Sequence, residues 1–91
     1  MDNAQIDVVK RDSETYQVTV RSKSTTVHTV TLKQHDYQHL SAGKVSPEKL
    51  IEKSFEFLLE RENNASILSR FDLTVIGRYF PEYENTIAGR L

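Results

Sequence analysis

The chain has 91 residues, of which 37% are apolar and 27% charged, and its 12 basic and 13 acidic side chains give a net charge of −1. This composition is typical of one soluble globular domain, and the balanced charge excludes a bulk attraction to nucleic acid or to an anionic membrane. The lack of cysteine excludes disulfides, thiolate zinc sites and cysteine nucleophiles, and favours a reducing cytoplasm.

The organisation expected is a single domain over residues 1–91. Residues 1–12 lack the basic and then apolar pattern of a signal peptide. No apolar run approaches the roughly 20 residues of a membrane span. We find no internal repeat and no linker that would separate a second domain.

Three β-rich runs fill the first third of the chain, at residues 6–9, 16–21 and 27–32. In the second and third runs apolar residues recur at every second position, the pattern of half-buried strands. Because the links between the runs are short, we expect an antiparallel meander. Its covered face would carry Tyr16, Val18, Val20, Val30 and Leu32.

The remainder of the chain is predicted to be helical. A short helix over 34–41 would end at Gly43, and the main helix would start at a Ser46 cap followed by Pro47 and run to about Glu62. Asn63-Asn64 breaks it. Asp72 would then cap a helix over 73–79, and Pro81 would separate that helix from the last one. The fold class expected is α+β, a three-stranded antiparallel sheet followed by three or four helices on one face.

The main helix carries an apolar arc of roughly 200°, wider than one sheet face requires. Either the later helices or a second subunit would cover the surplus. Phe57 and Tyr79 lie at the margins of the apolar sides of their helices, so we predict them as interface residues of a homodimer.

Candidates for chemistry are few. His35 and His39 lie four apart and would share one helix face, a spacing that permits metal chelation. The glutamate of a metalloprotease motif is missing, and two solvated histidines on a polar helix face are the favoured explanation of the pair. His28 shares a strand face with Val30, which indicates a hydrogen-bonded, half-buried side chain. We therefore expect no metal and no cofactor.

Catalytic motifs are also missing. Gly43, Gly77 and Gly89 are isolated, so they form no phosphate-binding loop, and no nucleophile motif is present. The glutamates at 56, 60 and 62 are typical of a solvated helix face, because nothing apolar surrounds them to raise a pKa. The sequence predicts that the protein is not an enzyme.

Residues 27–62 follow a strand–helix–helix order with a Gly-containing turn. In this order the segment resembles ribbon-helix-helix repressors and antitoxins. The resemblance implies that Thr29, Thr31 and Lys33 would read bases, and that Ser46 would contact phosphate. Basic residues are sparse and the following helix is acidic, so nucleic-acid binding is the alternative function.

The segment SFEFLLERENNASILSRFDLTVIGRYFPEYE resembles a small family of bacterial proteins, over residues 46–84. That family has no assigned activity, so the resemblance implies no ligand and no catalytic residue. The function that the sequence favours is a non-catalytic cytoplasmic module that acts by contact with another protein or with itself.

Overall fold

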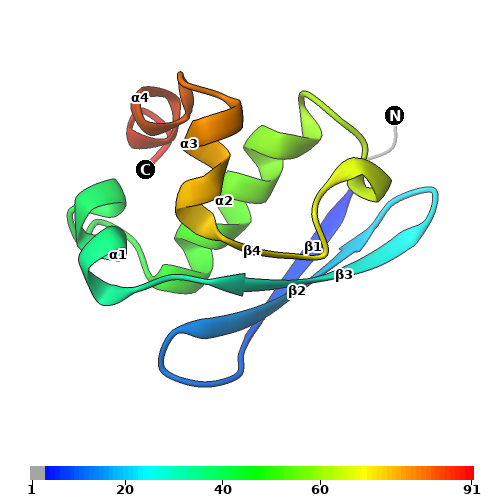
Figure 1. Ribbon diagram of the computed structural model, residues 1–91, viewed down its shortest axis with the longest axis horizontal. Coiled ribbons are helices and arrows are strands. Elements are labelled where there is room, and N and C mark those ends of the chain that lie inside the picture. The colour runs from blue at the N-terminus through cyan, green and yellow to red at the C-terminus, as the bar shows by residue number, and fades with distance from the viewer. Residues whose placement is uncertain (1–3) are drawn as a thin grey trace.

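The computed structural model describes residues 4–91 and places all of its helices on one face of a four-stranded sheet (Figure 1). The strands are β1 (Gln5–Lys10), β2 (Thr15–Arg21), β3 (Thr25–Thr31) and β4 (Arg70–Asp72). The helices are α1 (Gln34–Ser41), α2 (Pro47–Leu59), α3 (Ile76–Tyr79) and α4 (Tyr83–Ala88). Two 3-10 turns are η1 (Asn64–Ser66) and η2 (Leu73–Val75). The α+β class expected from the sequence is confirmed.

The sheet differs from expectation by one strand. Its order is β1-β2-β3-β4, and the first three strands form the predicted antiparallel meander. The fourth pairs parallel to β3, with Thr29 opposite Arg70 and Thr31 opposite Asp72, so the sheet is mixed. A three-residue strand is too short for a period-two pattern to reveal it.

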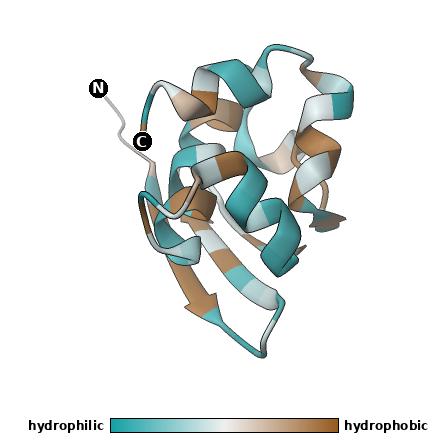
Figure 2. Cartoon of the chain, turned by 90° about the vertical axis from the view of Figure 1, so that its left-hand side faces the viewer, coloured by the Kyte–Doolittle hydropathy of each residue, from teal (hydrophilic) through white to brown (hydrophobic). Residues whose placement is uncertain are grey.

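The core lies between the inner sheet face and α2. The five apolar residues predicted to line the covered face of the meander are each at most 3% exposed. The residues between them on β2 and β3 point the other way, to the uncovered face, and Figure 2 shows this alternation of hydropathy along the strands. Against the covered face packs α2, with Leu50, Ile51 and Phe55 all at 0% exposure.

Helix α2 begins as the sequence indicates. Ser46 Oγ accepts a hydrogen bond from the Lys49 backbone N–H at 3.1 Å, and Pro47 occupies the first turn. The helix ends at Leu59, a few residues before the predicted end at Glu62, and residues that follow it form a turn. Within residues 4–91 no helix is long and apolar enough to cross a bilayer.

The surplus apolar arc of α2 is covered by the C-terminal helices. Phe57 is 0% exposed, and its ring lies 5.9 Å from that of Phe80 and 5.3 Å from that of Tyr83, both edge-on. Tyr83 and Ser54 share a buried hydrogen bond of 2.7 Å, and burial raises the pKa of the Tyr83 hydroxyl to about 12. Phe57 was predicted as an interface residue at the margin of the apolar side of α2. In the structure it is instead buried beneath the C-terminal helices.

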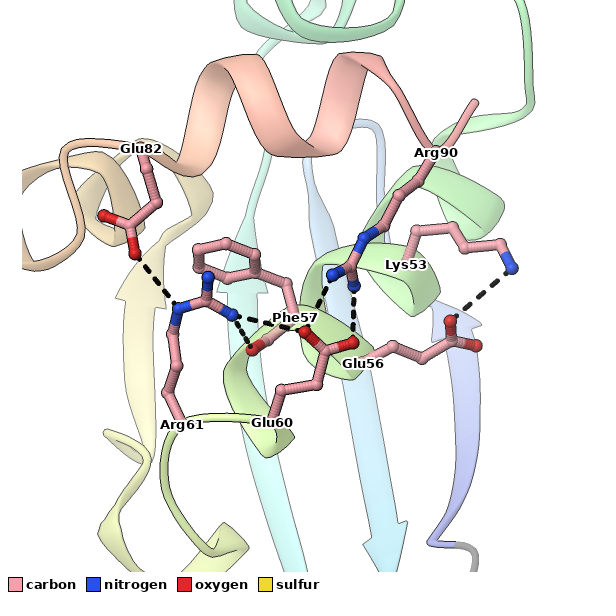
Figure 3. A network of polar contacts seen from close by, with 7 residues as sticks. All are labelled: Lys53, Glu56, Phe57, Glu60, Arg61, Glu82 and Arg90. Carbon is pink, nitrogen blue, oxygen red and sulfur yellow. Dashed lines mark hydrogen bonds and ion pairs between the residues drawn. The ribbon is translucent and has the colours of Figure 1, made fainter.

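Polar contacts fasten α4 over Phe57. Figure 3 shows Glu82, at the start of α4, and Arg90, just after its end, pointing toward the end of α2. Arg90 donates two hydrogen bonds of 2.7 Å to the Glu60 carboxylate, and Arg61 Nε lies 3.2 Å from a Glu82 carboxylate oxygen. The Arg61 guanidinium also stacks 3.6 Å over the centre of the Phe57 ring. Exposed ion pairs contribute little singly, but together these contacts fix the position of α4.

Phe55 should be a centre of stability. Its ring lies 5.4 Å from that of His28 and 5.9 Å from that of Phe71, so it joins α2 to β3 and β4. We expect Phe55→Ala to lower the free energy of unfolding by about 3–5 kcal/mol through lost burial and a cavity. Chemical denaturation measures this, with Val27→Thr on the uncovered sheet face as a control that should change little. A wild-type midpoint for Phe55→Ala would contradict the packing described.

Candidate interaction surface

The two histidines considered for metal binding do not share a site. The His35 side chain is 92% exposed, and its Nδ1 lies 3.4 Å from the Asp36 carboxylate. His39 Nε2 instead lies 3.1 Å from a Glu84 carboxylate oxygen, which links α1 to α4. Among residues 4–91, no group of three or more His, Cys, Asp or Glu side chains is arranged to hold a metal ion.

The residues suggested by the ribbon-helix-helix resemblance lie in a different setting from that family. Thr29 and Thr31 belong to the half of β3 that pairs with β2 on one side and with β4 on the other. The Thr31 hydroxyl already donates to the Asp72 carboxylate at 2.7 Å. A strand with both edges occupied there cannot pair with its twin, as the resemblance would require.

A buried polar chain shapes the molecule beside β3. Asn64 Nδ2 donates to Thr26 Oγ1 at 2.9 Å, and Thr26 Oγ1 lies 2.8 Å from His28 Nε2. His28 Nδ1 lies 2.8 Å from the Leu68 carbonyl oxygen, which can only accept, so Nδ1 carries the proton and Nε2 accepts from Thr26. This series of hydrogen bonds fixes the segment 64–68 against the sheet, and the Leu68 side chain remains at the surface.

Next to this segment lies an apolar groove that is open to solvent. It has a volume of about 240 Å³ and lies between the end of α2, the 66–68 segment and α3. Its lining consists of Leu58, Glu62, Ser66, Ile67, Leu68, Phe71, Val75, Ile76, Tyr79 and Phe80. Tyr79 is 66% exposed and Leu68 48% exposed, so two large apolar side chains of the lining are open to solvent.

One of these two exposed residues, Tyr79, was singled out in the sequence, and the other was not. Tyr79 was predicted as an interface residue from its place at the edge of a helical apolar face. Leu68 was missed because it lies in an irregular segment where no periodicity separates inside from outside. The signal that could have found it is the buried pair of polar residues, His28 and Asn64, that holds its backbone in place.

Asp72 lies between two residues that line the groove, Phe71 and Val75, and its carboxylate holds this part of the backbone. Its Oδ2 accepts from the Thr74 backbone N–H at 3.1 Å and from the Thr74 hydroxyl at 2.5 Å. Partial burial favours a raised pKa for this carboxyl, but hydrogen bonds from Thr74 and Thr31 outweigh it and the pKa is lowered. The carboxylate thereby joins β3, β4 and η2, the turn that carries Val75 into the groove.

Comparisons with protein-family models, with curated proteins and with solved structures found no match. The resemblance of residues 46–84 to a bacterial family stays a prediction.

Asp72→Ala should destabilise the protein in a pH-dependent way. A carboxyl whose pKa is lowered by folding stabilises the native state above its unfolded pKa, and that stability is lost as the pH falls through the folded pKa. We expect a loss of about 1–2 kcal/mol at pH 7, typical of a helix cap. The difference in unfolding free energy between the variant and the wild type should narrow below a pH of about 4, which is the pKa of an aspartate in the unfolded chain. Denaturation at pH 7 and pH 3 measures it, and an undiminished difference at pH 3 would contradict a role for the charge.

Duplex DNA should not change the mobility of the protein. The lysines near Thr31 are interspersed with acidic residues, and a specific binder usually carries a basic stripe. A gel-shift assay at moderate salt tests this. A salt-dependent shift that Lys33→Ala abolishes would instead establish the ribbon-helix-helix interpretation.

Proposed function

We propose that this protein is a non-catalytic, cytoplasmic protein-interaction module that binds an apolar segment of a partner protein in the groove beside Leu68 and Tyr79. The observation that carries the proposal is the groove itself, with two large apolar side chains open to water at its border. Exposed apolar surface that adjoins a pocket is costly for a free monomer and is typical of a contact site. The lack of cysteine agrees with a reducing compartment.

The size and lining of the groove limit what it accepts. A volume of about 240 Å³ accommodates one or two bulky apolar side chains rather than a whole cofactor. Most of the lining is aliphatic or aromatic, and Glu62 and Ser66 supply its polar atoms. The ligand that fits is a peptide segment that buries a leucine- or phenylalanine-sized anchor and leaves its polar atoms at the border.

Packed aromatic side chains support the groove from beneath. Phe80, which lines the groove, packs edge-on against the buried Phe57 ring. Phe57 in turn lies under the Arg61 guanidinium. Phe57, predicted from the sequence as an interface residue, would thus act indirectly by supporting Phe80, whereas Tyr79 would contact the partner. A preformed pocket needs little reorganisation on binding, which favours affinity.

A peptide-display selection against the immobilised protein tests the proposal. We expect the enriched peptides to share a bulky apolar residue and to bind the wild-type protein in solution. Leu68→Glu should weaken their binding at least about tenfold, as expected for the loss of a central apolar contact. Because Leu68 is half exposed, this change should leave the fold intact, and circular dichroism checks that point.

Val27→Glu is the matched control, because Val27 is 53% exposed but lies on the uncovered face of the sheet. The proposal requires that this variant bind the selected peptides as wild type does. Equal losses in Leu68→Glu and Val27→Glu, or a selection that enriches no apolar peptide, would refute a binding role for the groove.

A further inference from the structure

The outer edge of β1 is an open hydrogen-bonding edge. Within residues 4–91 this strand pairs only with β2, since it stands first in the sheet order. Its register with β2 is regular from Gln5 to Lys10, so no bulge interrupts it, and the strand contains no proline. Regular edges without such interruptions readily accept another strand.

Apolar side chains extend to this edge. Ile6 and Val8 lie on the inner face, opposite the fully buried Val20 and Val18, yet they are only partly buried themselves. Leu59 of α2 is also partly buried and packs at the border of the core. The core is therefore incompletely covered where the sheet ends at β1.

We propose that the outer edge of β1 pairs with β1 of a second copy of this chain, antiparallel about a two-fold axis, and joins two four-stranded sheets into one. The main-chain groups of the open edge would then find partners. The two apolar borders would meet, with Val8 and Ile6 covered by the same residues of the other copy. Pairing of identical edges about a two-fold axis is self-complementary and closes after two copies.

The register of this pairing follows from symmetry and charge. A two-fold axis perpendicular to the sheet keeps inner faces together, so opposed residues must lie on the same face of β1. Two registers use most of the strand, one centred on Asp7 and one on Val8. The first places two carboxylates directly opposite each other, which is unfavourable. The second places Val8 against Val8 and Ile6 against Lys10.

Charge complementarity favours the register centred on Val8. Lys10 lies on the inner face, opposite Tyr16, and an edge lysine normally discourages pairing unless the partner offers acidic groups. Beside Ile6 lies a hollow of about 530 Å³. Its lining consists of Ala4, Ile6, Ser22, Glu56, Leu59, Glu60, Glu62, Asn63 and Asn64.

Three carboxylates border this hollow, those of Glu56, Glu60 and Glu62. Glu56 already pairs with Lys53 and Glu60 with Arg90, whereas Glu62 forms no ion pair within residues 4–91. In the proposed register the Lys10 of one copy lies opposite Ile6 of the other, on the side of this hollow, where Glu62 is the carboxylate that remains to receive it. In the single chain, among the described residues, Lys10 forms no ion pair. Lys10 would therefore discourage pairing with an arbitrary strand but suits pairing with β1 of a second copy. For this reason we infer that a second copy of the chain occupies the edge.

Disulfide trapping tests the register. The natural chain has no cysteine, so Val8→Cys introduces a single thiol. Opposed residues of antiparallel strands have Cα atoms about 4.5–5.5 Å apart, within the range of a disulfide. We expect Val8→Cys to form a covalent dimer under mild oxidation at least about tenfold faster than Val27→Cys, as proximity of the two thiols dictates. Val27 is the more exposed residue, so random collision would favour the control.

Sedimentation equilibrium tests the charge argument. Wild-type protein should dimerise at micromolar concentration. Lys10→Glu should weaken the dimer at least about tenfold, because it replaces the attraction between Lys10 and Glu62 by repulsion between two carboxylates. Lys23→Glu, in the exposed turn between β2 and β3, should leave the dimer unchanged. Leu68→Glu should also leave it unchanged, so this result is independent of the groove.

Two results would overturn the inference. The first is a monomeric wild-type protein at high micromolar concentration. The second is trapping of Val27→Cys as fast as Val8→Cys. Faster trapping of Asp7→Cys than of Val8→Cys would overturn the register and the charge argument that selects it.

Discussion

Burial of α2 on two sides is the constraint on which the rest of this structure depends. A chain of 91 residues supplies only one thin core, and α2 carries much of the apolar surface that can fill it. The sheet covers one side through Phe55, and α3 and α4 cover the other through Phe57. The C-terminal helices are short, so their position depends on contacts with α2 rather than on their own helical stability.

This arrangement determines where apolar surface remains exposed. Since the C-terminal helices lie over the middle and end of α2, they leave a groove between α3 and the 66–68 segment. At the β1 edge of the sheet, Ile6, Val8 and Leu59 are only partly covered. The two surfaces share one residue, Glu62, which borders both the groove and the hollow beside β1, but they differ in kind. The groove accepts side chains, and the β1 edge offers main-chain hydrogen bonds.

Much of the fold could be predicted because its signals are local. The period-two runs at 16–21 and 27–32, the Ser46 cap and the Asp72 cap all occur where the sequence indicates them. The strand β4 could not be predicted, because three residues carry no periodicity and the β3 residues that pair with it lie 41 positions earlier in the sequence. Strand pairing and helix packing depend on contacts between residues far apart in the sequence, and a helical wheel contains no information about such contacts.

The site was harder to predict than the fold for the same reason. The wheel of α2 shows correctly that its apolar arc exceeds one sheet face, but it cannot say what covers the surplus. Phe57 was expected at a dimer interface, whereas Phe80 and Tyr83 cover it within the chain. Leu68 gave no periodic signal. It is 48% exposed, and the hydrogen bond between His28 and its carbonyl oxygen holds its backbone. Tyr79 was predicted as an interface residue from the margin of its helix's apolar side. It is 66% exposed, and its interface role stays a prediction.

The central claim is that the apolar surface of α2 is satisfied within one chain, so that contacts between copies form elsewhere. A series of amide NMR spectra at increasing protein concentration tests it most directly, because every backbone position is observed at once. The account predicts concentration-dependent shifts in residues 5–10 and beside the acidic hollow, with α3, α4 and the buried face of α2 unchanged. Shifts centred on Phe57, Phe80 and Tyr83 would contradict it, since they would mean that the C-terminal helices give way to a second copy.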